Sequence, residues 1–311
     1  IIIIFINNKM NKIYIVLIII FILNIFGIIT YIKQKIEEYE SAEEWVKYVE
    51  SMKRKSIGYK TRPYKIYYIN MEKSVDRRKN MEKQFRKWNI PAVRIRGIDG
   101  YSLKDKNKGT LYNGMKFENY STRLNPGEIG CTLSHIIAIK EAYANMHSQV
   151  IFLEDDTGID LLNNVEHRLS DVLRPHEDKT INLSPAFTPL DLEKKFTTDF
   201  GMSTVAFYMP EKEMKKIIDT YIKGNTIILP ETVNISDEMF SKYNVKDARA
   251  DILMYSGNAV SYIGEPYFYP RLGNSTMGYG GTTGLEKKRI EDIIEKTKDL
   301  DKYHDTTETK K

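Results

Sequence analysis

Three consecutive acidic residues follow a short apolar run in the middle of the chain. Val150–Leu153 leads directly into Glu154, Asp155 and Asp156. Open α/β sheets bind ligands at the carboxyl ends of their strands, and a strand here delivers three carboxylates to such an edge. Crowded carboxylates repel one another unless a cation lies among them, and hard oxygen ligands suit Mg²⁺ or Mn²⁺. The pattern indicates a metal site, with an acid-rich solvated turn as the alternative.

Two adjacent arginines open a helix that helical spacing predicts at 75–89. Arg77 and Arg78 fall on either side of its apolar stripe, in the first turn. Cations at this end oppose the helix dipole, which favours a nearby anion. The diphosphate of a nucleotide is one candidate anion. Ion pairs with Asp99 or with the acids at 154–156 are another, and the sequence leaves both open.

A second predicted helix begins at a capping box. Asn125 and Glu128 occupy the two positions of the box, which gives Glu128 a structural role. Cys131, Ser134 and His135 follow within the next two turns. His135 lies opposite the apolar stripe of this helix, and periodicity predicts that it is exposed rather than turned toward a cleft.

A single acid, Asp251, precedes the apolar run Ile252–Met254. An aspartate in this position commonly caps the start of a helix. The spacing alone does not distinguish such a cap from a catalytic base.

These residues need a framework that brings distant segments together. Apolar runs predict strands at 64–71, 92–98, 150–156, 180–183 and 205–209. Helical spacing predicts helices at 75–89, 125–146 and 211–223. This alternation predicts an α/β domain with a mostly parallel central sheet covered by helices.

The ends of the chain predict further segments. After an extension at 1–12, residues 13–32 form a nearly uncharged stretch long enough to cross a bilayer. A membrane anchor is preferred over a cleaved signal peptide, because no small-residue cleavage site follows. A helical stem and linker at 33–63 then leads to the main domain at 64–284, and 285–311 form a last helix and polar tail. Asn-x-Ser/Thr sequons fit a single-pass, type II protein with a lumenal domain.

The overall composition excludes some classes of protein. The formal net charge is +5, with acids spread among the bases, which gives no nucleic-acid-binding footprint. The single cysteine cannot form an intramolecular disulfide.

Four sequence segments occur in an order that resembles glycosyltransferase family 25, which includes lipooligosaccharide and collagen hydroxylysine galactosyltransferases. They are INMEKSVDRR (69–78), RIRGIDG (94–100), GEIGCTLSH (127–135) and FLEDD (152–156). Weaker similarity continues to about Met277 and includes ARADILM (248–254). The resemblance implies a GT-A type fold, a UDP-sugar donor, Mn²⁺ or Mg²⁺, and a glycan or protein acceptor.

The resemblance also implies roles for particular residues in metal binding and catalysis. Asp156 is expected to be the principal metal ligand, with Glu154 assisting. Asp155 is expected to assist at the metal or the ribose. Asp251 matches an acid that could act as the base in an inverting displacement.

The same resemblance implies a nucleotide-sugar site. Asn70, Arg77 and Arg78 are expected near the nucleotide, and Ser134 and His135 are expected to line the donor cleft. Galactose is the preferred donor sugar, with another sugar such as glucose as the alternative. A non-catalytic, membrane-tethered module for glycan binding or assembly is the alternative of a different class.

Overall fold

The computed structural model describes residues 64–160, 162, 165, 167–184, 195–198, 203–235, 246–257, 259–264 and 267–270, with Ile25 and Glu295. The predicted membrane anchor (13–32), the stem and linker (33–63) and the C-terminal segment (285–311) lie outside this set, apart from those two residues. Within the described part of the chain, no helix has the length and apolar character needed to span a bilayer.

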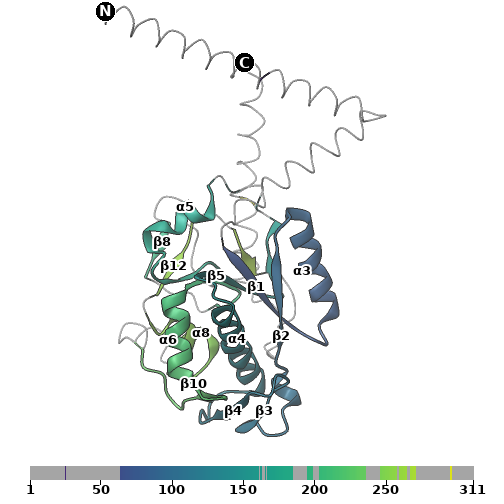
Figure 1. Cartoon of the computed structure of the whole chain (residues 1–311), viewed down its shortest axis with the longest axis vertical. Coiled ribbons are helices and arrows are strands. Elements are labelled where there is room, and N and C mark those ends of the chain that lie inside the picture. Colours follow the sequence, from purple (N-terminus) through teal and green to yellow (C-terminus); the bar gives the residue numbers. More distant parts are fainter. Residues whose placement is uncertain are drawn as a thin grey trace, which may run out of the picture. The chain divides into compact units, whose positions relative to one another are not determined.

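A seven-stranded sheet forms the centre of the domain (Figure 1). Its strands, in spatial order, are β2 (Ala92–Gly97), β1 (Lys65–Met71), β5 (Gln149–Glu154), β9 (Ala206–Pro210), β7 (Thr180–Asn182), β12 (Ala259–Tyr262) and β8 (Phe196–Thr197). The five strands predicted from apolar runs are all present, within a few residues of their predicted ends. The α/β class is therefore confirmed.

The prediction of a mostly parallel sheet is wrong, because the sheet is mixed. β1 pairs in parallel with β2 and β5, and β7 pairs in parallel with β12. β9, however, runs antiparallel to both β5 and β7, and β8 runs antiparallel to β12. A strand's direction depends on the connection that leads into it, and alternation of strands and helices along the sequence does not report it.

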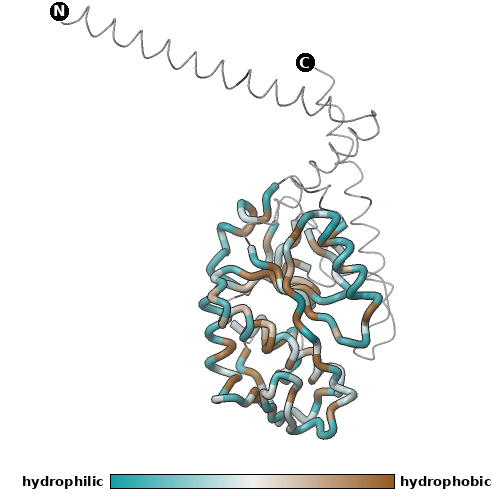
Figure 2. Tube along the Cα trace, turned by 45° about the vertical axis from the view of Figure 1, so that its right-hand side comes forward, coloured by the Kyte–Doolittle hydropathy of each residue, from teal (hydrophilic) through white to brown (hydrophobic). Residues whose placement is uncertain are grey.

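One face of the sheet is covered by α3 (Val75–Trp88). The predicted stripe of Met81, Phe85 and Trp88 is buried there. It packs in one hydrophobic cluster with Tyr68 of β1 and Leu153 of β5. In Figure 2 the hydrophobic colouring is concentrated along the central strands, where this cluster lies. Further along the chain, between β5 and β7, lie α5 (Leu169–Leu173) and a 3-10 turn at Arg174–His176.

The opposite face is covered by α4 (Pro126–Ala144), α6 (Glu211–Tyr221) and α8 (Ala250–Tyr255) (Figure 1). A smaller four-stranded sheet contributes Phe117, Ile227 and Leu229 to the hydrophobic cluster on this face. Its strands in order are β10 (Ile222–Lys223), β11 (Thr226–Leu229), β4 (Lys116–Asn119) and β3 (Lys108–Thr110). β13 (Tyr269–Pro270) and β6 (Thr157–Gly158) form a separate antiparallel pair.

α4 is buried on nearly every side, which corrects one prediction. The capping box is present as expected, with Asn125 Oδ1 accepting from Glu128 N at 3.0 Å and Glu128 Oε2 accepting from Asn125 N at 2.8 Å. His135 is 1% exposed, so its predicted exposure is wrong. Periodicity assumes that only the apolar stripe meets the core, whereas the His135 ring also lies 5.5 Å from the Phe207 ring of β9, and Thr132 Oγ1 bonds to the Ala248 carbonyl at 3.1 Å.

The loop after β2 is held against α4 by contact between two glycines. A Cβ on Gly100 would lie 1.6 Å from the Pro126 carbonyl oxygen, and a Cβ on Gly130 would lie 2.6 Å from the Ile98 carbonyl oxygen. Neither side has room for a methyl group, because both neighbours are backbone atoms. This approach fixes the short 3-10 turn Gly100–Ser102 on the first turns of α4.

Candidate active site

The candidate residues meet at one edge of the central sheet. Because β1, β2 and β5 are parallel neighbours, their carboxyl ends at Met71, Gly97 and Glu154 lie at the same edge. Open α/β sheets bind ligands at this edge.

Two adjoining cavities open at this edge. The larger has a volume of about 670 Å³ and is lined by Lys73, Arg96 and Tyr112, among others. The smaller, of about 60 Å³, is lined by Cys131, Ser134, His135, Glu154 and Asp155, among others. The two share four lining residues, Met71, Gly97, Ile98 and Asp99. The larger cavity therefore adjoins the smaller one, which Glu154 and Asp155 line at the end of β5.

The three acids are divided between the two faces of the sheet. Asp155 faces α3, where Arg77 Nη1 donates to Asp155 Oδ1 at 2.8 Å. Asn70 Nδ2 donates to Asp155 Oδ2 at 2.7 Å. Burial raises the pKa of Asp155, although Arg77 and Asn70 act against that shift. Asp155 is thus a buried and fully partnered carboxylate that positions Arg77 and Asn70.

Asp156 has a different environment. Its Oδ2 lies 3.3 Å from Arg77 Nη1, but its buried Oδ1 has no hydrogen-bond partner among the described residues. Burial, together with the negative charges of Glu154 and Asp155, raises the pKa of Asp156 to about 7, against the opposing effect of Arg77. An ionised carboxylate with an unpartnered buried oxygen favours a cation nearby.

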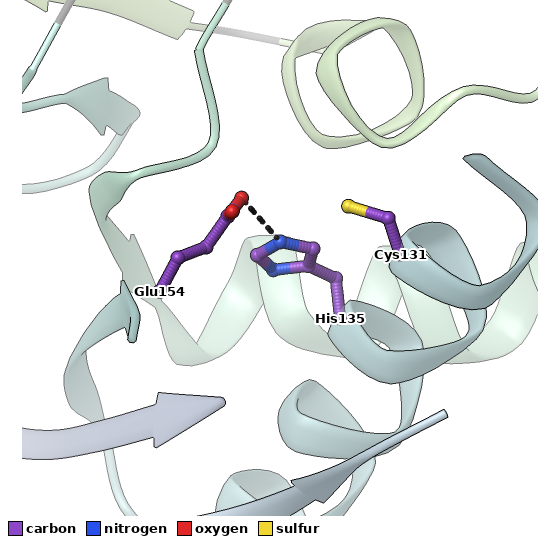
Figure 3. Close-up of side chains that lie close together, drawn as sticks. All are labelled: Cys131, His135 and Glu154. Carbon is purple, nitrogen blue, oxygen red and sulfur yellow. Dashed lines mark hydrogen bonds and ion pairs between the residues drawn. The ribbon is translucent and has the colours of Figure 1, made fainter. Parts of the chain in front are cut away.

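Glu154 faces α4 on the opposite side of the sheet. Its Oε1 accepts from Thr204 Oγ1 at 2.6 Å and lies 3.2 Å from His135 Nε2 (Figure 3). Burial acts to raise the pKa of Glu154, but the interactions with His135, Thr204 and Arg77 outweigh it and lower the pKa. With the carboxylate ionised, the 3.2 Å contact requires His135 Nε2 to carry the proton. Both hydrogen bonds fall on Oε1, which leaves Oε2 for another ligand.

Cys131 lies one helical turn before His135 and points toward the same space (Figure 3). The thiol, the imidazole and the Glu154 carboxylate each offer a ligand atom, and these atoms all lie within 4.8 Å of one another. Burial raises the pKa of the Cys131 thiol well above its ordinary value, as do the charges of Glu154 and Asp251.

Ser134 lines the smaller cavity but is already engaged in structure. Its Oγ donates to the Gly130 carbonyl at 2.6 Å and accepts from Ile98 N at 2.8 Å. These two bonds tie the loop after β2 to α4. The single proton of Ser134 is thus used within the helix, and its expected role at a donor cleft stays a prediction.

Arg78 does not join the acids. Its Nη1 lies 3.4 Å from Glu72 Oε1, at an exposed pair. Glu72 also accepts from Arg94 Nη2 at 3.2 Å. Neither Arg77 nor Arg78 pairs with Asp99, whose partner is Lys73. Of the two arginines, only Arg77 is brought to the three acids.

Asp251 lies in the first turn of α8, and its alternative role as a helix cap is wrong. Arg249 occupies the N-cap position, and Asp251 is the second residue of the helix. Burial and then the charge of Glu154 raise the pKa of Asp251 to about 6, while His135 and Arg249 act to lower it. The structure therefore brings Asp251 close to the Glu154 side of the site.

Thr204 is a site residue that the sequence did not reveal. It lies just before β9, and the Glu154 amide donates to the neighbouring Val205 carbonyl at 2.9 Å. Because β9 is antiparallel to β5, the start of β9 lies beside the end of β5. Knowledge of the strand direction could have placed Thr204 here. Lys73, two residues after the predicted strand 64–71, and Arg96, within the predicted strand 92–98, line the larger cavity and were also missed.

The chemistry of these residues fits a divalent cation at Asp156. The unpartnered Asp156 Oδ1 and the uncommitted Glu154 Oε2 are hard oxygen donors at the end of one strand. Such donors suit Mg²⁺ or Mn²⁺. These residues would hold the ion, and a ligand with negative charge could complete its coordination.

The two arginines give a matched test of these electrostatics. We expect Arg77→Ala to lower the free energy of unfolding of the metal-free protein by about 2–3 kcal/mol, below the 3–5 typical of fully buried pairs. The substitution leaves Asp155 and Asp156 without their shared cation. Arg78→Ala should cost less than about 1 kcal/mol, since its partner Glu72 is exposed. Urea denaturation measures both, and equal losses would contradict the assignment of Arg77.

Comparisons with known proteins come from two sources. The sequence profile of a family described as glycosyltransferase family 25 (LPS biosynthesis protein) matches residues 63–250, more than half of the chain. A protein from Aedes aegypti named glycosyltransferase 25 family member is 33% identical over 97 residues. That match covers 29% of this chain and only 16% of the relative's length.

Proposed function

The chain belongs to glycosyltransferase family 25, and we propose that it transfers a sugar from a UDP-sugar to a hydroxyl group of a glycan or protein acceptor. The family match ends at residue 250, one residue before Asp251. Because the match spans residues 63–250, it includes the acids at 154–156 and the residues of α4, but not Asp251.

One observation carries the proposal most strongly. Asp156 holds an unpartnered buried oxygen beside Arg77, and its neighbours Glu154 and Asp155 line the smaller cavity, which adjoins the cavity of about 670 Å³. A nucleoside diphosphate with its divalent cation would suit this arrangement, because Asp156 offers a carboxylate oxygen to a cation and Arg77 offers a guanidinium to phosphate oxygens. The cavity gives room for the rest of the nucleotide sugar.

Each site residue then has a role in donor binding. Asp156, with Glu154, would hold the cation, which when bound supplies a positive charge to the departing diphosphate. Arg77 remains fixed by Asp155 and presents its guanidinium to the phosphate side. Asn70 holds Asp155 from the other side and accepts from Arg94 Nε at 3.1 Å. Arg78 pairs with Glu72, which lines the larger cavity, and would act on the donor only through that residue.

Asp251 is the candidate base on the acceptor side. Its pKa of about 6 leaves it ionised near neutral pH, yet basic enough to accept a proton from an attacking hydroxyl. The acceptor oxygen would attack the anomeric carbon as Asp251 takes its proton, and the sugar–phosphate bond would break on the opposite side. This in-line displacement inverts the anomeric configuration.

The finer assignments extend this proposal. Resemblance to galactosyltransferases of the family supports galactose as the transferred sugar and Mn²⁺ as the ion. The mixed sheet, with its acids at the end of β5, is compatible with a GT-A type domain.

A donor-hydrolysis screen tests the proposal. The purified protein is incubated with UDP-galactose, UDP-glucose and other nucleotide sugars, with and without Mn²⁺, and released UDP is measured. We expect Mn²⁺-dependent release, fastest from UDP-galactose, and loss of release with excess chelator. Full activity in chelator would contradict the metal role. Absence of both UDP release and UDP binding would contradict the transferase proposal.

We further propose that residues 13–32 anchor the chain in a membrane, with the domain in a lumenal compartment. Asn234, which begins a sequon, is exposed and could carry a glycan there. Asn119 and Asn182 also begin sequons but are buried. Protease protection of the domain in intact microsomes tests this placement, and digestion without detergent would contradict it.

A further inference from the structure

Three side chains of different chemistry converge on the α4 side of the site. Cys131 and His135 are one turn apart on α4, and Glu154 reaches them from the end of β5 (Figure 3). Their potential ligand atoms all lie within 4.8 Å of one another. The proposed transfer reaction uses neither the Cys131 thiol nor its approach to His135.

This set of donors selects a particular class of ion. A thiolate and an imidazole are soft or borderline ligands, which Mg²⁺ and Mn²⁺ use poorly and which Zn²⁺ and Co²⁺ prefer. Three protein ligands and one open position are typical of a tetrahedral zinc site that also binds water or a small ligand. We propose that Cys131 Sγ, His135 Nε2 and the Glu154 carboxylate form a binding site for Zn²⁺.

The surroundings allow an ion to enter. Cys131 and Glu154 are both partly exposed, and both line the cavity of about 60 Å³ together with His135. A space of this size exceeds what a water-sized group requires, which is about 10–15 Å³. The cavity therefore gives an ion room beside its three ligands.

Binding requires two proton movements. The Cys131 thiol releases its proton to solvent as the sulfur–zinc bond forms. The imidazole proton moves from Nε2, which takes the metal, to Nδ1. His135 Nδ1 is buried and has no acceptor within the described part of the chain. This unpaired donor weakens the site relative to zinc sites with a complete outer shell, so the ion should exchange readily with chelators.

The site differs from the one proposed for the catalytic ion in its ligands and its preferred metal. Asp156 and the free oxygen of Glu154 offer only hard oxygens, whereas the α4 site depends on sulfur and nitrogen. The two sites share Glu154. Two divalent cations bound to one carboxylate repel each other, so the two metals should bind antagonistically.

The absorption spectrum of the Co²⁺-loaded protein tests the proposal directly. Cys131 is the single cysteine of the sequence, so a thiolate-to-cobalt charge-transfer band can arise only from this residue. The full chain is purified without a histidine tag, reduced and stripped of metal, and then titrated with Co²⁺. We expect the band to saturate at one equivalent and to disappear when one equivalent of Zn²⁺ is added. Binding of Co²⁺ without this band would overturn the proposal.

Two variants separate this site from the proposed catalytic ion. Cys131→Ser should lower Zn²⁺ affinity at least about 100-fold, since changes to outer-shell residues alone cost 10–100-fold. Competition with a chromophoric zinc chelator measures this change. Asp156→Asn keeps all three ligands and should retain the cobalt band. Loss of the band in Asp156→Asn, or unchanged zinc affinity in Cys131→Ser, would contradict the site. If Cys131→Ser fails to fold, the spectrum of the unaltered protein still decides. Neither readout depends on sugar transfer.

Discussion

Asp156→Asn is expected to abolish metal-dependent transfer and, at the same time, to stabilise the metal-free protein. Loss of the cation at the departing diphosphate removes about 4 kcal/mol of transition-state stabilisation, or about 10³-fold in rate. The stabilisation arises because the substitution removes a charge whose buried Oδ1 has no hydrogen-bond partner in the described residues. We expect a gain of about 1–2 kcal/mol at pH 7.5. Transfer assays with Mn²⁺ and thermal unfolding in chelator measure the two effects.

Asp155→Asn is the matched control for this variant. Asp155 accepts hydrogen bonds from both Arg77 and Asn70, and an asparagine has only one acceptor oxygen, so the substitution leaves one buried donor unpaired and should destabilise the metal-free protein. Opposite signs for the two neighbouring substitutions are the expected result. Wild-type activity in Asp156→Asn, or a loss of stability equal to that of Asp155→Asn, would contradict the role of Asp156 as the metal ligand.

The raised pKa of Asp156 predicts that the stability of the metal-free protein depends on pH. The pKa of Asp156 in the folded, metal-free protein is about 7, above its ordinary value of 3.8. The folded state therefore binds more protons than the unfolded state between these values. The contribution of Asp156 to the free energy of unfolding falls as pH rises from about 4 to about 7. This fall in the free energy of unfolding should be absent in Asp156→Asn, which urea denaturation of both proteins across this pH range would measure.

Asp251→Asn is expected to slow transfer by about 10²–10⁴-fold and to leave UDP-sugar binding unchanged. Loss of a general base removes a proton acceptor needed only in the transition state. Asn has nearly the same shape, and Asp251 does not cap α8, so the helix should keep its position. Calorimetric titration with UDP and a transfer assay on one variant separate binding from chemistry.

Asp247→Asn serves as the control for Asp251. Asp247 lies four residues earlier and forms a bidentate ion pair with Arg249, at 2.7 and 2.8 Å. Its substitution disturbs the start of α8 without removing the candidate base. Equal losses of transfer in the two variants would indicate that movement of α8, rather than proton transfer, limits the rate. Near-normal transfer in Asp251→Asn would end its candidacy as base.

Local patterns predicted the elements well, because each reflects contacts within a few residues. The Asn125–Glu128 capping box and the stripe of Met81, Phe85 and Trp88 depend only on spacing along one helix. The position of Asp155 and Asp156 at a strand end likewise follows from one apolar run. These features could be predicted because no distant segment alters them.

The features that the sequence missed depend on what packs against a segment from elsewhere. His135 is buried because its ring lies 5.5 Å from the Phe207 ring of β9 and its Nε2 lies 3.2 Å from Glu154 at the end of β5. Thr204 reaches Glu154 because β9 reverses direction, which no repeat along the chain records. The three adjacent acids were expected to act together, but a strand end sends neighbours to opposite faces. Glu154 and Asp155 therefore have separate partners.

The burial of α4 has a consequence for motion at the site. Proteins open locally with free energies that range from near zero at exposed segments to the full unfolding free energy in the core. α4 is buried on both sides and carries Cys131 and His135, so these side chains belong to the part of the domain that opens last. The Gly100–Gly130 contact extends this protection to the loop after β2. We therefore expect slow fluctuations that admit or release a substrate to occur in segments other than α4, which keeps Cys131 and His135 in place.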